Sequence, residues 1–207
     1  MHRYLIPAIF VSFTLPAVAG GFGEEATPPA VLPAAASETS MDWSGAYVGL
    51  QYGTVAGGNL SNPGGAFAPD FDGETYGVFA GYRLDYGRFV LGGEIDFMTG
   101  SGELSRPGLV LDVDYDRLIR AGVEAGWEAG QALIYGTAGF ADIDLQTAGA
   151  TGSSGYYYGF GVDYAVNERF VIGLEALKHE FSDFDGIAPA GSEADLTTID
   201  VNLAIRF

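Results

Sequence analysis

The last twelve residues, 196–207, alternate strictly between two kinds of side chain. Phe207, Ile205, Leu203, Val201 and Ile199 are large and apolar, whereas the residues between them are polar, charged or small. Successive side chains of a β-strand point to opposite faces, so this period of two predicts a strand with one apolar face. If this strand closes a barrel, the preceding chain must supply an odd number of similar strands.

Seven earlier segments alternate in the same way. They span residues 43–55, 74–85, 88–98, 113–127, 131–141, 156–166 and 169–179. The composition of 32 Gly, 12 Tyr and 14 Phe agrees, because glycine disfavours helices and aromatic residues favour strands. The pattern therefore predicts eight strands in all.

In these strands one file of side chains is apolar and the opposite file combines glycine with charged residues. The charged residues of the second file are Arg83, Glu94, Arg120, Glu124, Asp163, Glu175 and Asp200. In segment 131–141 either file is apolar enough to be the outer one, so the facing of that strand stays open.

The links between the predicted strands alternate in length. Three are tight turns, at 85–88, 128–130 and 165–168, and four are longer and rich in Gly, Ser, Asp and Pro, at 56–73, 99–112, 142–155 and 180–195. A transmembrane barrel has this asymmetry, with short periplasmic turns and longer extracellular loops.

A soluble eight-stranded barrel of the lipocalin type is the structural rival, and its apolar file would face inward around a ligand. The charged opposite file contradicts that arrangement, so we expect the apolar file to face lipid, where every backbone group must be paired in a closed sheet. The predicted fold is all-β: an eight-stranded antiparallel up-and-down transmembrane β-barrel with short periplasmic turns and long extracellular loops.

The N-terminal region differs in composition from the rest of the chain. Residues 1–20 combine Arg3, an apolar run and a small-residue end, which predicts a cleaved signal peptide and export to the bacterial outer membrane. Residues 21–41 are rich in Ala and Pro without periodicity, which predicts a disordered linker before the barrel at 42–207. No later stretch approaches twenty apolar residues, so no membrane-spanning helix is expected.

Two motifs carry a resemblance to known proteins. The aromatic terminus with Phe207, Ile205, Leu203 and Val201 resembles the signal that the barrel-assembly machinery reads in outer-membrane barrels. With the opening D-W-S-G-A-Y-V-G-L-Q-Y-G at 42–53 and the pattern I-R-A-G at 119–122 through A-L-I-Y-G-T-A-G at 132–139, the chain resembles the alphaproteobacterial porin-like surface-antigen family of small outer-membrane β-barrels. Trp127 and Glu128 depart from the expected turn.

The resemblance implies a Gram-negative cell-envelope protein with structural and surface-exposed roles, and in some members a pore activity. Eight strands enclose a space that side chains just fill, so an open channel is not expected. An adhesin or host-interaction barrel acting through acidic loops, and a weak porin, remain alternatives. The oligomeric state stays open.

The charged file predicts a charge cluster in the lumen. We expect Glu94 to pair with Arg120, and Glu175 and Asp200 to lie at a similar depth. Because carboxylates outnumber arginines there, water, a cation or carboxyl protonation must relieve the excess. The alternative is a solvated plug that only satisfies inward polar groups.

Arg117 and Lys178 fall on the outward file near the outer rim, where charge is tolerated. We expect them to contact lipopolysaccharide phosphates or, alternatively, only to extend to the membrane interface.

Other functional classes have little support. The net charge of −18 argues against nucleic acid, and no cysteine is available for thiolate chemistry. His179, expected at the surface, and Ser182 lie on opposite faces of one strand, which disfavours a lipid A-modifying enzyme. No catalytic, cofactor-binding or metal-binding motif is found.

Overall fold

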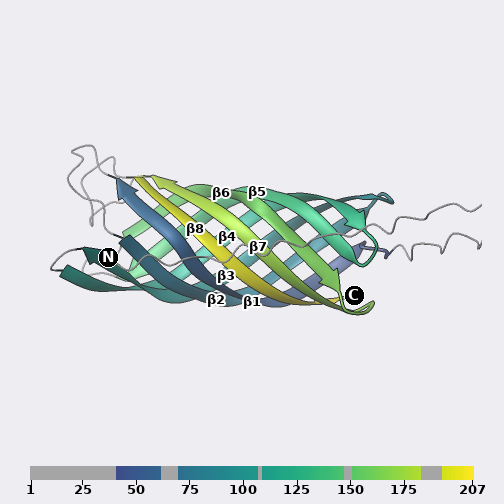
Figure 1. Cartoon of the computed structure of the whole chain (residues 1–207), viewed down its shortest axis with the longest axis horizontal. Coiled ribbons are helices and arrows are strands. Elements are labelled where there is room, and N and C mark those ends of the chain that lie inside the picture. Colours follow the sequence, from purple (N-terminus) through teal and green to yellow (C-terminus); the bar gives the residue numbers. More distant parts are fainter. Residues whose placement is uncertain (1–40, 62–69, 107–108, 147–150, 183–192) are drawn as a thin grey trace, which may run out of the picture. The chain divides into compact units, whose positions relative to one another are not determined.

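The computed structural model describes residues 41–61, 70–106, 109–146, 151–182 and 193–207, which form eight β-strands. These are β1 (Gly45–Ser61), β2 (Asp70–Asp85), β3 (Phe89–Arg106), β4 (Leu109–Ala129), β5 (Ala132–Gln146), β6 (Thr151–Ala165), β7 (Phe170–Ser182) and β8 (Glu193–Arg206). Each strand pairs antiparallel with the next, and β8 pairs with β1, which closes the barrel (Figure 1). The predicted up-and-down barrel is confirmed.

The strands extend well beyond the predicted segments. β3 and β4 continue through most of 99–112, and their backbones pair as far as Arg106 and Leu109. The Gly-, Ser- and Asp-rich sequence hid this extension, because polar strands beyond the bilayer lose the apolar alternation. The remaining connections at this end, and the predicted signal peptide and nearly all of the linker, lie outside the described residues. In the part of the chain that the structure describes, no helix is long and apolar enough to cross a membrane.

The three tight turns lie at the other end of the barrel, as the sequence predicted. Gly87 and Gly130 adopt φ values of 94° and 67°, in the left-handed region that favours glycine. In the third turn, Asn167 Oδ1 accepts hydrogen bonds from the backbone N–H groups of Arg169 and Phe170, both at 2.9 Å.

The apolar file faces outward along every strand. Leu50, Val123 and Phe160 are more than 60% exposed, and the aromatic side chains of this file are exposed as well. In β5, Ile134 is exposed and Leu133 is buried, which settles the facing of that strand. The lipocalin-like alternative, with apolar residues around an internal ligand, is therefore excluded.

Two apolar layers fill the lumen at different depths. Near the short turns the layer comprises Trp43, Tyr47, Phe79, Val90, Leu133, Tyr135, Ala165, Val171 and Ala204. Farther along the barrel, the second comprises Met98, Leu118, Ala141, Ile143, Tyr157, Leu177, Phe181 and Ala194. Glycine makes room for the rings, since a Cβ on Gly81 would lie 2.3 Å from the Tyr47 ring.

Candidate functional site

The charged residues of the lumen form two arginine-centred groups. In the first, Arg83 binds Glu124 through two hydrogen bonds, from Nε to Oε1 at 2.6 Å and from Nη2 to Oε2 at 2.8 Å. Its Nη1 also donates to Asp163 Oδ2 at 2.7 Å. All three side chains are buried, so these charge-assisted bonds form away from solvent.

The second group is centred on Arg120. Its Nη2 donates to Asp96 Oδ1 at 2.8 Å and its Nη1 donates to Asp200 Oδ2 at 3.0 Å. Gln51 Nε2 also donates to Asp200 Oδ2, at 3.0 Å. The Arg120 guanidinium lies 5.4 Å from the centre of the Tyr157 ring, which belongs to the second apolar layer.

The predicted pair between Glu94 and Arg120 is wrong. The register of β3 and β4 places Asp96 opposite Arg120, and Glu94 opposite Gly122. Estimating the depth of each residue in the barrel by counting from the predicted strand ends misplaces the partner of Arg120 by two residues. Asp96, missing from the predicted cluster, occupies the same inward file as Glu94, and that signal could have identified it.

Two lumen carboxylates form no ion pair among the described residues. Glu94 Oε2 accepts a hydrogen bond from Tyr47 Oη at 2.9 Å, and Glu175 Oε1 accepts one from Tyr135 Oη, also at 2.9 Å. Glu175 lies opposite Asp200 in the register of β7 and β8. Six carboxylates thus accompany the guanidinium groups of Arg83 and Arg120, and Arg206 adds a third guanidinium beside Trp43. Burial makes the remaining excess of negative charge costly.

The residues before β1 close the lumen at the short-turn end. Trp43 is fully buried, and the guanidinium groups of Arg83 and Arg206 lie 5.7 and 5.3 Å from the centre of its ring. The Trp43 backbone N–H donates to Asp85 Oδ2 at 2.9 Å, and the Asp85 backbone N–H donates to Ser44 Oγ at 3.1 Å. These bonds hold Trp43 beneath the charge cluster.

The residues on both sides of Trp43 are also anchored. The Met41 backbone N–H donates to Glu128 Oε1 at 3.0 Å. This bond gives a structural role to Glu128, which the sequence placed in a turn and which lies near the end of β4. The Ser44 N–H donates to Asp42 Oδ1 at 2.8 Å, and this bond lowers the pKa of the Asp42 carboxyl.

His179 is not a surface residue, contrary to expectation. It is 2% exposed, and its ring stacks with Tyr157 at 5.9 Å and with Phe181 at 6.1 Å. β7 extends past His179, so His179 belongs to the inward-facing file of this strand. That file continues into the second apolar layer. Ser182 is exposed on the other face, so the two side chains form no catalytic pair.

Comparison with known families supplies the context for this closed barrel. The family described as outer membrane protein beta-barrel domain matches residues 28–207. The chain belongs to this family. Among relatives of this outer-membrane barrel are the 31 kDa outer-membrane immunogenic proteins of Brucella melitensis and Brucella suis, each 29% identical over 84% of this chain and 88% of the relative.

A solved structure shows the same fold. Neisserial surface protein A is 16% identical to this outer-membrane barrel, with a TM-score of 0.52 over 79% of this chain and 98% of that one. The protein is therefore an outer-membrane β-barrel, located in the bacterial outer membrane.

Arg117 and Lys178 lie on the outer face of the barrel, and both are engaged by carboxylates. Arg117 Nη2 lies within ion-pair distance of Asp144 Oδ2, at 2.5 Å, and of Asp142 Oδ1, at 3.4 Å. Lys178 Nζ lies 2.9 Å from Glu180 Oε1 and 3.7 Å from Asp195 Oδ1. A lipopolysaccharide phosphate would have to compete with these partners.

The predicted assembly residues line the outer face at the end of β8. Val201, Leu203, Ile205 and Phe207 are all exposed, and the Phe207 N–H donates to Ala46 O at 2.9 Å, which joins the C-terminus to β1. Their recognition by the assembly machinery stays a prediction. No group of three or more His, Asp or Glu residues in the described ranges is arranged to hold a metal ion.

Proposed function

We propose that this protein is a structural outer-membrane barrel that supports envelope integrity and surface presentation, with a lumen plugged by side chains. The observation that carries the proposal is the layered lumen, in which the arginine–carboxylate network lies between two apolar layers. Arg83 contacts one layer through Tyr47 and Arg120 contacts the other through Tyr157.

The small size of two cavities inside the lumen supports a lumen plugged by side chains. One of about 10 Å³ lies beside Glu94, and another of about 20 Å³ lies beside His179. The first has room for about one water molecule and the second for one or two. Hydrated ions need a continuous wider path, so we propose that the folded barrel conducts no steady current.

Single-channel recording of the folded protein, with and without lipopolysaccharide, tests this proposal. Slower or faster gel mobility before heating, compared with the heated sample, verifies that the barrel is folded. We expect a silent bilayer in both conditions. Regular conductance steps from the wild-type barrel would overturn the plug and favour a weak porin.

Envelope integrity is tested in cells. A strain that lacks the protein should become more sensitive to detergent, and wild-type protein should restore resistance. Restoration by a barrel whose connections at 62–69 and 183–192 are shortened would show that the barrel itself suffices. Failure of that variant, despite normal assembly, would favour the adhesin alternative, in which the extracellular connections act on a host partner.

Lipopolysaccharide contact at Arg117 and Lys178 is part of the proposal. Four carboxylates surround these two bases, so the contact is expected to need exchange of partners or a bridging divalent cation. Replacing both bases with Ala should lower lipopolysaccharide co-purification, and exposed Arg88→Ala in a periplasmic turn is the matched control. Equal co-purification of all three proteins would remove this contact from the proposal.

We propose no enzymatic reaction for this barrel. The separation of His179 and Ser182 on opposite faces supports this view. A lipid A deacylation assay with wild type and His179→Ala tests it, and activity that is lost in the variant would contradict it.

A further inference from the structure

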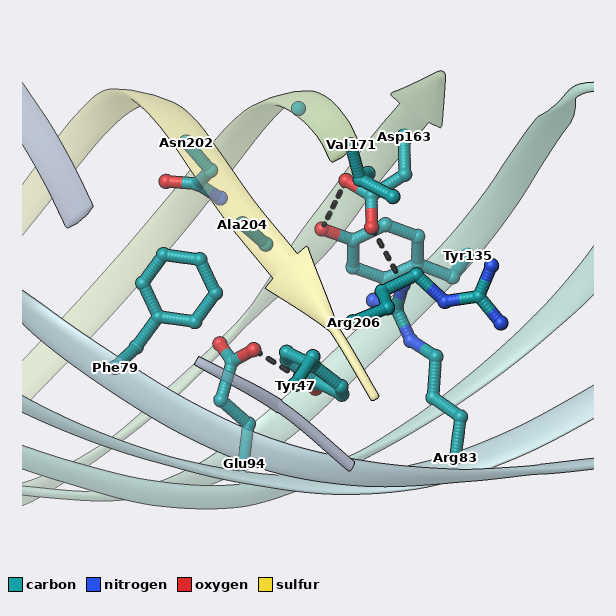
Figure 2. Close-up of a pocket in the computed structure, with 11 residues that line it drawn as sticks. Tyr47, Phe79, Arg83, Glu94, Tyr135, Asp163, Val171, Asn202, Ala204 and Arg206 are labelled. Atoms are coloured by element: carbon teal, nitrogen blue, oxygen red, sulfur yellow. Dashed lines mark hydrogen bonds and ion pairs between the residues drawn. The ribbon is translucent and has the colours of Figure 1, made fainter. Parts of the chain in front are cut away.

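The cavity of about 10 Å³ lies in the charged part of the lumen. Glu94 lines it, and no Arg, Lys or His in the described ranges forms an ion pair with Glu94. Arg83 and Arg206 also line the cavity, but Arg83 donates to Glu124 and Asp163. Arg206 donates to the backbone oxygens of residues 42 and 44, and Figure 2 shows its guanidinium directed away from Glu94.

Asn202 supplies a second polar group to the same cavity. The residue is 7% exposed, and its Oδ1 has no hydrogen-bond partner among the described residues. Glu175, the other lumen carboxylate without an arginine, lies on the neighbouring strand β7, two residues from the register partner of Asn202. Figure 2 shows the Asn202 carboxamide and the Glu94 carboxylate on two sides of the space beside Phe79. A buried amide oxygen without a donor indicates that a further group binds here.

We propose that this cavity binds one monovalent alkali cation, held by Glu94 and by Asn202 Oδ1. A carboxylate and an amide oxygen are ligands that hard cations prefer. The cation offsets part of the negative charge that Arg83 and Arg120 leave without an ion pair.

The geometry favours a single small cation over other occupants. A divalent ion would need more carboxylate ligands, and no such group exists in the described ranges. The cavity holds about one water-sized sphere, which suits sodium better than caesium. A water molecule or a proton on Glu94 is the competing occupant, and neither would discriminate between alkali ions.

Salt-exchange unfolding of the full chain in detergent micelles is the first test. Urea unfolding is followed in NaCl, CsCl and choline chloride at equal ionic strength. A ligand that binds only the folded state multiplies the ratio of folded to unfolded protein by one plus the ligand concentration divided by Kd. At a ligand concentration of a hundred times Kd, this factor is about 100. We expect stabilisation by sodium over caesium and choline. Equal midpoints in the three salts would overturn the proposal.

Variants locate the ion. Glu94→Gln and Asn202→Leu should each lose most of the sodium dependence, and Asn202→Asp should strengthen it. Glu168→Gln, which removes the same charge from an exposed periplasmic turn, is the matched control and should keep the full dependence. Full sodium dependence in Glu94→Gln would place the ion elsewhere and refute the site. If the variants do not fold, the wild-type comparison of sodium with caesium still decides.

Discussion

Arg83 and Glu124 form a bidentate ion pair that joins β2 to β4 across the intervening strand β3. Gly92 of β3 lies opposite both residues in the two registers, so the three positions form one row across the sheet. A Cβ on Gly92 would lie 2.2 Å from Glu124 Oε1. The pair therefore depends on the missing side chain of Gly92 as much as on its own charges.

Replacing Gly92 with Ala should disturb this row. The added methyl group has to displace the buried Glu124 carboxylate, and overpacking of this kind typically costs about 1–3 kcal/mol. The free energy of unfolding in urea measures the change. Gly93→Ala is the matched control, because its Cβ would meet no atom closer than 3.6 Å, on the outer face. Equal stability of the two variants would show that Glu124 moves freely.

Replacing Arg83 with Met should be more damaging than replacing it with Lys. The Met variant leaves Glu124 and Asp163 without their cation, and breaking a buried pair in this way costs about 3–5 kcal/mol. Lys keeps the charge but cannot form the bidentate contact. Urea unfolding compares the variants, with the exposed Arg88→Met as control. A Met variant as stable as wild type would show that the carboxylates are already neutral.

We expect the Trp43 side chain to close the periplasmic end of the lumen. Trp43→Ala removes a buried ring that contacts two guanidinium groups, and deletion of a core Trp costs about 3–5 kcal/mol. Unfolding in urea tests this, and Trp127→Phe on the exposed outer face should change stability little. Retained stability in Trp43→Ala would mean that the segment before β1 contributes nothing to closure.

Phe207→Ala should separate assembly from stability. Phe207 is 79% exposed, so loss of its ring should leave refolding of purified protein into detergent nearly unchanged. In cells we expect a lower fraction of folded, heat-modifiable protein in the outer membrane, because the assembly signal is weakened. An unchanged fraction in cells would remove Phe207 from that role.

The apolar alternation predicted the strands and, except for β5, their facing, because lipid-facing residues must be apolar at every second position. Leu203 and Val123 illustrate this. The pairing of inward charges was less predictable, because one shift in register changes every partner, and Glu94 was assigned to Arg120 for that reason.

The apolar layers and the position of His179 were missed for a different reason. Leu177 and His179 follow Glu175 on one inward file, but a file of mixed polarity has no signature that distinguishes lumen from loop. Burial there depends on how far β7 extends and on the rings of Tyr157 and Phe181.

The most direct test of the account is a cysteine scan of residues 46–53 in β1, which is simple because the chain has no cysteine. Spin labels at these positions in lipid vesicles report collisions with oxygen, which dissolves in lipid, and with a water-soluble relaxation agent. We predict strong oxygen collisions at positions 46, 48, 50 and 52 and protection from both agents at 47, 49, 51 and 53. Protection of Val48 and Leu50, with lipid contact at Tyr47 and Gln51, would contradict an outward apolar face and the outer-membrane barrel with it.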